Sequence, residues 1–242
     1  MADVVKVSDA IAQFLKEKEI KHVFGIIGSA NSHIFDSITN LGYTEIICVH
    51  HEQAATMAMQ TYFKVSGKVT AAIITAGGGS VNGITGVLSA WADSNPGIVI
   101  SGQENKRFIE KMKGMRMWGI QGFDSSGMVK EITKFSTMVM DPKKALYELE
   151  KGYFISQDAR PGPVWIDYPM DIQGSRIPIE DLKHFNIPKK KKVPSLNKEM
   201  NNVFDLIGKA KRPVFWLGNG IRLSKAENLI EGLLDKIPFP TL

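Results

Sequence analysis

Apolar residues follow two different periods along the first 170 positions of the chain. Short β-branched runs, typical of buried strands, occupy residues 22–27, 45–49, 69–75, 97–101, 132–140 and 163–167. Segments with helical apolar spacing lie around and between them, at residues 7–18, 31–40, 53–65, 81–93 and 143–157. This alternation predicts an α/β fold, an open six-stranded parallel sheet with helices on both faces. Residues 105–122 have neither period and are expected to form a long irregular loop.

The pattern changes after residue 172, which predicts a domain boundary. We assign residues 1–172 to the first domain and residues 173–195, with the run Lys189–Lys192 and its flanking prolines, to a linker. Residues 196–242 then read as the incomplete beginning of a second α/β domain, with helices at 196–209 and 224–236 around a buried strand at 213–217. One strand cannot bury a sheet face by itself, so we expect the chain to be a fragment.

Composition narrows the class of protein. The chain has 242 residues, 43% hydrophobic and 23% charged, which is typical of a soluble globular protein, and no apolar run is long enough to cross a membrane. Part of the net charge of +5 comes from the lysine run, which has no aromatic residues between its lysines and is interpreted as solvated linker, not as a nucleic-acid patch. Cys48 is the single cysteine, so we expect a buried thiol and a cytoplasmic location.

Glu52 is the strongest candidate for chemistry. It stands where the strand at 45–49 is followed by a helix, hence at the carboxyl edge of the predicted sheet, where ligands bind in open α/β folds. Burial there would raise the pKa of a carboxyl group and let it share a proton with a heterocyclic nitrogen. The alternative is a helix-start glutamate stabilised by the helix dipole. A zinc-protease helix is excluded because Ala55 stands where the second histidine would be.

A glycine-rich stretch, Thr75-Ala76-Gly77-Gly78-Gly79-Ser80-Val81-Asn82-Gly83, joins a strand to a helix. Backbone N–H groups at such a junction can bind a polar ligand, and Asn82 is the polar side chain available there. A nicotinamide-dependent reductase remains an alternative, although its fingerprint normally opens the first βαβ unit and this stretch follows the third strand. Gly83 and Gly86 are interpreted as glycines that allow close packing between strand and helix.

Five motifs in order carry a resemblance to a known family: HEQAA, TAGGGSVNGITG, ADSNPGIVISGQ, ITK and ARPGPVWIDYP. Together they resemble the N-terminal, pyrimidine-binding domain of thiamine-diphosphate enzymes, closest to the acetolactate synthase group. The resemblance covers residues 5–172, and residues 211–242 look like the opening of that family's central domain. It implies thiamine diphosphate as cofactor and a carboligase or decarboxylase acting on a 2-keto acid.

The resemblance also implies roles for single residues. Glu52 would hydrogen-bond the aminopyrimidine ring and so promote removal of the thiazolium proton, which makes it the catalytic residue. The other implied cofactor contacts are Ile27, Gly28, Thr75, Gly78 and Asn82, and the implied substrate contacts are Gln121 and Ser29.

The sequence departs from the family pattern at three places, which leaves the donor substrate open. Residues Ile26-Ile27-Gly28 replace an aromatic-proline-glycine turn, Gly78 replaces a proline, and Gly122 replaces a frequent glutamate. For Gln121 the alternative interpretation is a loop amide bonded to backbone.

The family holds the cofactor's diphosphate through Mg²⁺ on a C-terminal domain with a Gly-Asp-Gly motif, and this sequence has no such stretch. The resemblance therefore implies no metal ligand here, an inactive isolated chain, and a homodimer, a homotetramer or a separate diphosphate-binding subunit. The surface around Glu52, Met57, Ala58 and the glycine-rich stretch would be the interface. Whether FAD binds stays open, as does a non-catalytic subunit of the same fold.

Overall fold

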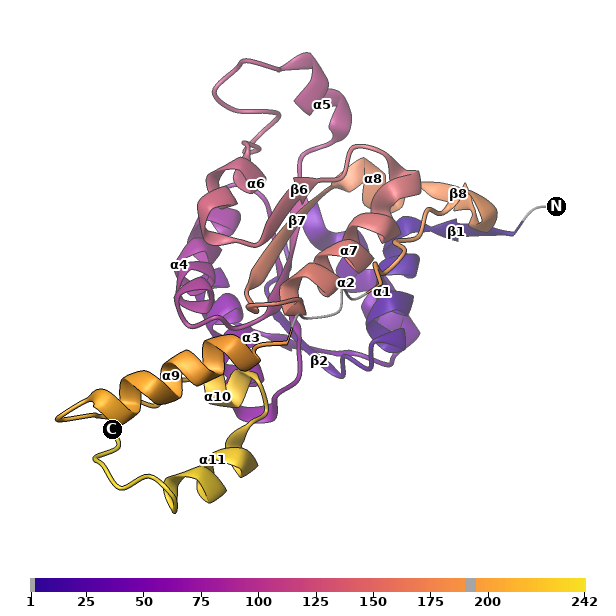
Figure 1. The fold of residues 1–242 in the computed structure, drawn as a ribbon. Helices are drawn as coiled ribbons and strands as arrows, with labels where there is room; N and C mark the ends of the chain where they lie inside the picture. The colour runs from indigo at the N-terminus through magenta and orange to yellow at the C-terminus, as the bar shows by residue number, and fades with distance from the viewer. Residues whose placement is uncertain (1–2, 190–194) are drawn as a thin grey trace. The chain divides into compact units, whose positions relative to one another are not determined.

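The computed structural model describes residues 3–189 and 195–242, so most of the lysine run lies outside the described residues. The chain divides into two compact units, Met1–Ile187 and Pro188–Leu242 (Figure 1). The first unit contains the sheet and its helices. The division falls later than the boundary expected at residue 172.

The first unit is built on a six-stranded sheet. Its strands are β2 (His22–Gly25), β3 (Glu45–Cys48), β4 (Ala71–Ile74), β5 (Gly97–Gln103), β6 (Phe135–Met138) and β7 (Pro163–Pro169). Their order across the sheet is β3-β2-β4-β5-β7-β6, and all five pairings are parallel. The predicted α/β fold with a six-stranded parallel sheet is confirmed.

Alternate residues of the central strands face opposite sides of the sheet and enter two separate cores. Ile73, Ile100 and Ile166 belong to one core, with apolar residues of α1 (Val7–Glu17), α2 (Ser32–Leu41) and α7 (Ala145–Gln157). Ala72, Val99 and Trp165 belong to the other, with residues of α3 (Glu52–Ser66) and α4 (Gly78–Ala92). Helices therefore cover both faces, as predicted (Figure 1).

Part of the predicted linker belongs to the first unit. After α8 (Met170–Gly174), strand β8 (Arg176–Pro178) pairs antiparallel with β1 (Val4–Lys6), and Ile177 is buried in the first core. This pairing extends the unit beyond residue 172. Each strand has only three residues, too few for a period in the sequence to reveal them.

The second unit has much less packing than the first. Its helices are α9 (Asn197–Lys209), α10 (Gly220–Leu223) and α11 (Glu227–Leu234). The buried strand predicted at 213–217 was wrong: within residues 195–242 there is only an isolated bridge, from Phe215 to Thr241, and Trp216 is 86% exposed. No residue in this range is buried, because no second strand is present to form a sheet.

The prediction of a buried thiol was also wrong. Cys48 is exposed, because it ends β3, an edge strand that has a neighbour on one side only. The sequence showed a β-branched run but could not show the place of its strand in the sheet.

Candidate functional site

Glu52 is the first residue of α3, yet its side chain does not face solvent. The residue is only 8% exposed, and Asn82 on α4 donates a hydrogen bond from Nδ2 to Glu52 Oε2 at 3.0 Å. Within residues 3–189 and 195–242, Glu52 forms no ion pair and its Oε1 accepts no hydrogen bond. A glutamate present only for the helix dipole would gain nothing from burial or from a partner on another helix, so this geometry favours a functional role.

Close contact between α3 and α4 brings the Asn82 amide to Glu52. A methyl group added at Gly86 would lie 2.2 Å from Thr56 Oγ1, so only glycine permits this approach. Thr56 Oγ1 also donates to the carbonyl oxygen of Gly83 at 3.0 Å. Gly83 lies against both β4 and α3, whereas Gly86 lies against α3, so the close packing predicted for these glycines exists and is partly between two helices.

Thr75 lies between two glycines beside the Glu52 carboxylate. A Cβ at Gly28 would be 2.5 Å from Thr75 Oγ1, and a Cβ at Gly79 would be 2.6 Å from Thr75 Cγ2 and 2.8 Å from Glu52 Oε1. The Thr75 hydroxyl is buried and has no hydrogen-bond partner among the residues that the structure describes. A buried hydroxyl without a partner costs free energy, which a ligand with a polar group would recover.

Gln121 extends the same cluster from the other side of the glycine-rich stretch. A Cβ at Gly77 would lie 2.9 Å from Gln121 Cβ, so the Gln121 side chain occupies the space directly over Gly77. Gly77 has φ +71°, a conformation that glycine adopts without strain, and it caps the start of α4. The loop that follows β5 is thereby in contact with the loop that follows β4.

Comparison with known proteins shows which family the chain belongs to. Residues 5–128 match the family model described as "Thiamine pyrophosphate enzyme, N-terminal TPP binding domain". The chain belongs to this family.

Its curated relatives include acetolactate synthase large subunits. That of Lactococcus lactis is 28% identical over 97% of this chain and 40% of its own length, and that of Haemophilus influenzae is 32% identical over 93% and 39%. The mitochondrial acetolactate synthase of Schizosaccharomyces pombe is 32% identical over 91% of this chain and 34% of its own length. The chain thus spans about 40% of the length of the first of these relatives.

Three of the predicted contact residues are exposed. Ile27 is 61% exposed, Ser29 and Gly78 are exposed as well, and a Cβ at Gly78 would meet nothing within 4 Å. They follow β2 or open α4, so they lie at the same sheet edge as Glu52, but within residues 3–189 and 195–242 no hydrogen bond or ion pair joins them to the Glu52 side chain. Their roles stay predictions.

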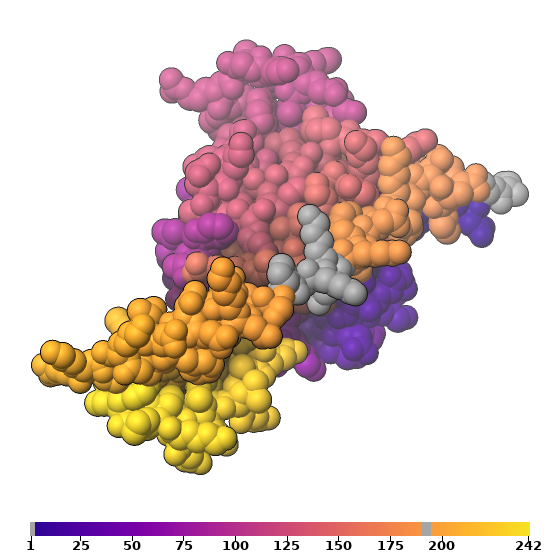
Figure 2. All heavy atoms as spheres, in the orientation of Figure 1, coloured from indigo at the N-terminus to yellow at the C-terminus, as the bar shows by residue number. Residues whose placement is uncertain are grey.

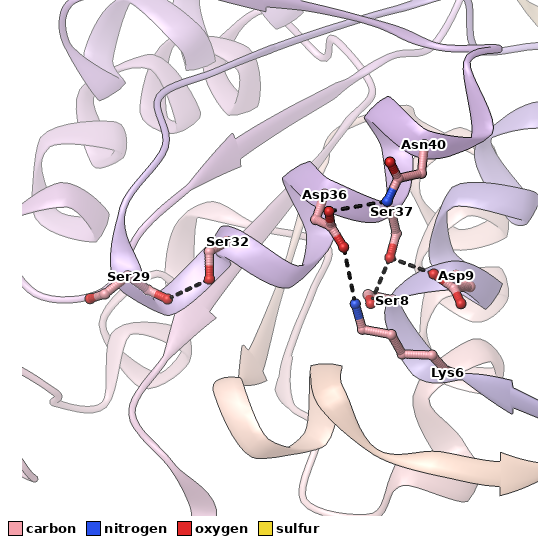
Figure 3. Close-up of polar contacts among 8 residues, drawn as sticks. All are labelled: Lys6, Ser8, Asp9, Ser29, Ser32, Asp36, Ser37 and Asn40. Atoms are coloured by element: carbon pink, nitrogen blue, oxygen red, sulfur yellow. Dashed lines mark hydrogen bonds and ion pairs between the residues drawn. The ribbon is translucent and has the colours of Figure 1, made fainter.

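The local contacts of Ser29 concern the start of α2. Its carbonyl oxygen accepts a hydrogen bond from Ser32 Oγ at 3.1 Å (Figure 3). The polar network that joins α2 to the α1 side of the fold lies further along α2 and includes the ion pair of Lys6 with Asp36 at 3.4 Å (Figure 3). Ser29 takes no part in that network in Figure 3.

The loop expected to be irregular contains a short helix, so that prediction was wrong for residues 106–111. Helix α5 (Lys106–Lys111) and the segment after it project from the first unit, at the top of Figures 1 and 2. The projecting part carries two exposed methionines, Met115 and Met117, whereas Trp118 and Gly122 pair as a bridge that closes a tight turn around Gln121.

Two buried carboxylates near this edge were missed by the sequence analysis. Glu104, directly after β5, accepts hydrogen bonds at Oε1 from the N–H groups of Ile120 and Gln121, at 3.2 Å each. Asp167, on β7, accepts from Trp165 Nε1 at 2.8 Å. Glu104 follows β5 and Asp167 lies two residues before the end of β7, so both acids are near the carboxyl edge of the sheet, the position that singled out Glu52 in the sequence.

Asp167 anchors the residues that follow the Gln121 loop. Its Oδ2 accepts from Ser125 Oγ at 2.8 Å and from the Ser126 N–H at 3.0 Å, at the start of α6 (Ser125–Met128). Complete burial raises the pKa of Asp167 from 3.8 to about 6, and its hydrogen bonds with Trp165 and the serines oppose that rise.

The described residues form no metal site or membrane span, and a pocket among them lies away from Glu52. Within residues 3–189 and 195–242, no group of three or more side chains could hold a metal ion, and no helix has the length and apolar character needed to span a bilayer. A pocket of about 420 Å³ is lined by Trp91, Lys134, Arg160 and neighbouring residues. Because these residues precede β5, β6 and β7, the pocket lies at the amino edge of the sheet, opposite Glu52.

Proposed function

We propose that this chain supplies the pyrimidine-binding half of the active site in a thiamine-diphosphate-dependent carboligase or decarboxylase that acts on a 2-keto acid, similar to acetolactate synthase. The observation that carries the proposal is the buried Glu52 carboxylate, whose Oε2 is bonded to Asn82 and whose Oε1 has no donor among the described residues. The names of the relatives, all acetolactate synthases, support the reaction class.

The residues present fit an aminopyrimidine ring. Such a ring needs an acid or carboxylate at a ring nitrogen and small residues where its flat face approaches backbone. Glu52 Oε1 supplies the carboxylate oxygen, and Gly28 and Gly79 are the small residues that leave space for the ring. The Thr75 hydroxyl, which has no partner among the described residues, offers a further hydrogen bond. Bound cofactor would thus satisfy two polar groups that the protein alone does not.

Glu52 would share a single proton with the cofactor through its Oε1 atom. Because Asn82 donates to Oε2, that oxygen remains an acceptor, and Oε1 is the oxygen able to carry or share a proton. Asn82 fixes the direction of Oε1, and the low exposure of Glu52 limits competition from water. When bound, thiamine diphosphate supplies the carbon nucleophile and stabilises the electron pair that remains after decarboxylation.

The rest of the active site would come from another polypeptide segment. We assign Mg²⁺ and the diphosphate to a domain outside this chain, supplied within a homodimer or homotetramer or by a separate subunit. Met57 on α3 and Val81 on α4 are 38% and 43% exposed beside Glu52 and would contact that partner. We place the protein in the cytoplasm because its single thiol needs no oxidising compartment.

Titration calorimetry would test the proposal. We expect thiamine diphosphate with Mg²⁺ to bind the chain, alone or with its diphosphate-binding partner, and Glu52→Gln to weaken that binding. Inorganic diphosphate with Mg²⁺ is the matched control ligand, since it lacks the pyrimidine ring and should not respond to the substitution at Glu52. Binding of NADPH in place of thiamine diphosphate would support the reductase alternative and overturn the proposal.

A further inference from the structure

Glu104 is an acidic residue with an unusual environment. It is only 8% exposed and, within the described residues, forms no ion pair. Its charge is instead met by backbone, because the consecutive N–H groups of Ile120 and Gln121 both donate to Oε1. Two successive N–H groups converging on one anion form a nest, an arrangement that binds anions in many proteins.

Three glycines shape the space that Glu104 and Gln121 occupy. A Cβ at Gly119, which has φ +58°, would lie 2.6 Å from Glu104 Oε2, and a Cβ at Gly122 would lie 2.5 Å from Glu104 Cγ. A Cβ at Gly77 would meet the Gln121 side chain. Glu104 therefore fills the inside of the turn 118–122, and Gln121 leaves that turn directly over Gly77.

The neighbouring residue fastens the other end of the loop. Gln103 donates from Nε2 to the Phe123 carbonyl oxygen at 2.9 Å and accepts the Glu104 N–H at 3.0 Å. The end of β5 thus holds both sides of the turn, while Ile120 at its tip is 90% exposed and gains little from burial. Without the Glu104 carboxylate, the described contacts leave the N–H groups of Ile120 and Gln121 without an acceptor.

We propose that Glu104 is the positioning residue for Gln121: its buried carboxylate folds the turn 118–122 and so places the Gln121 amide over the glycine-rich stretch, where the 2-keto acid is recognised. The substrate part of this inference rests on the proposed function. The structural part does not, since it concerns only Glu104, the turn and Gly77.

Hydrogen exchange at the Ile120 and Gln121 amides of this chain tests the structural part. Glu104→Ala should accelerate exchange there by about tenfold or more. Each hydrogen bond that this substitution removes stabilises the closed turn by roughly the free energy that corresponds to a tenfold change in the opening equilibrium. Glu104→Gln keeps an acceptor oxygen and should remain within about threefold of the wild type. Glu110→Ala, in exposed α5, is the matched control and should leave both amides unchanged.

A second substitution displaces Glu104 without removing it. Gly122→Ala puts a methyl group 2.5 Å from Glu104 Cγ and should accelerate the same two amides. Added to Glu104→Ala, it should have a smaller effect, since the contact with Cγ is then gone and only those with Gln103 Oε1 and the Cβ of residue 104, at 2.9 and 3.0 Å, remain. Unchanged exchange in both Glu104→Ala and Gly122→Ala would overturn the proposal, even if one variant folded poorly.

Steady-state kinetics on the protein with its diphosphate-binding part test the role in recognition. Glu104→Ala should raise KM for the 2-keto acid by about tenfold and change kcat by less than about threefold, with Glu104→Gln near the wild type. An unchanged KM together with a loosened turn would overturn that role. If the wild type turns over no 2-keto acid, the proposed function fails, and the exchange data still decide whether Glu104 positions Gln121.

Discussion

The two units of this chain have similar sequence patterns and different interiors. Helix α1 in the first unit and helix α9 in the second both have apolar residues at helical spacing, but the apolar face of α1 is buried while no described residue of α9 is. Phe14 on α1 is 1% exposed, and Phe204 on α9 is 61% exposed. Amphipathic spacing therefore indicates which face a helix can bury. The number of neighbouring strands and helices determines whether that face is buried.

The largest predicted difference concerns these two phenylalanines. Phe14→Ala should lower the free energy of unfolding by about 3–5 kcal/mol, because it empties a closed site in which the Phe14 and Tyr153 rings pack edge to face with their centroids 5.7 Å apart. Phe204→Ala is the matched control and should change the main unfolding transition by no more than about 0.5 kcal/mol. Urea denaturation followed by circular dichroism measures both, and equal losses would abolish the contrast between the units.

The next effect depends on pH and reports how completely the first unit excludes water. Burial raises the pKa of Asp167 from 3.8 to about 6, so the folded state keeps a proton that the unfolded chain releases. The stability from this group is present below about pH 4 and is lost as pH rises through about 6, a change of about 3 kcal/mol.

Asp167→Asn removes the titrating group and should flatten this part of the pH profile. Unfolding free energies at several pH values between about 4 and 7, wild type minus variant, isolate the contribution of Asp167 from that of other carboxylates. A difference that stays constant across this window would mean that Asp167 does not hold its proton in the folded state.

The smallest effect concerns two helical glycines. Gly86→Ala inserts a methyl group between α4 and α3 and should cost about 1–3 kcal/mol, because Thr56 and the Met57 backbone are in the way. Gly208→Ala, in α9, meets nothing within 4 Å and should leave the main transition within about 0.5 kcal/mol while adding slightly to helix content. A Gly86→Ala protein as stable as the wild type would contradict the close α3–α4 packing that brings Asn82 to Glu52.

Much of the first unit could be predicted because its strands are buried on both faces and its helices on one. Such burial produces β-branched runs in the strands and helical apolar spacing in the helices. These patterns were strong enough to predict six strands in a parallel sheet. The β1–β8 pair and the short helix α5 were missed because three to six residues carry too little periodicity. The false strand at 213–217 shows the converse error, since an apolar run such as Val214 to Leu217 does not specify a partner strand.

Only the site residues that stand near one another in a sequence motif, or at a strand end, could be predicted. Glu52, Asn82 and Thr75 stand out from position relative to a strand end and a glycine-rich stretch, and the fold brings them together. Glu104 directly follows the motif ADSNPGIVISGQ and Asp167 lies within ARPGPVWIDYP, but neither motif by itself indicates a role for the carboxylate. Their importance comes from contacts with residues far along the chain, such as Gln121 and Ser125, and such contacts appear only after the strand order is known.

The account depends on Glu52 handling a proton for bound thiamine diphosphate. The most direct measurement is the rate at which bound cofactor exchanges its C2 proton with D₂O, in the protein with its diphosphate-binding part. Glu52→Gln should slow this exchange by about 100- to 10,000-fold, whereas Glu45→Gln, an exposed control on β3, should not change it. Equal exchange rates in Glu52→Gln and the wild type, with cofactor bound in both, would contradict the role of Glu52.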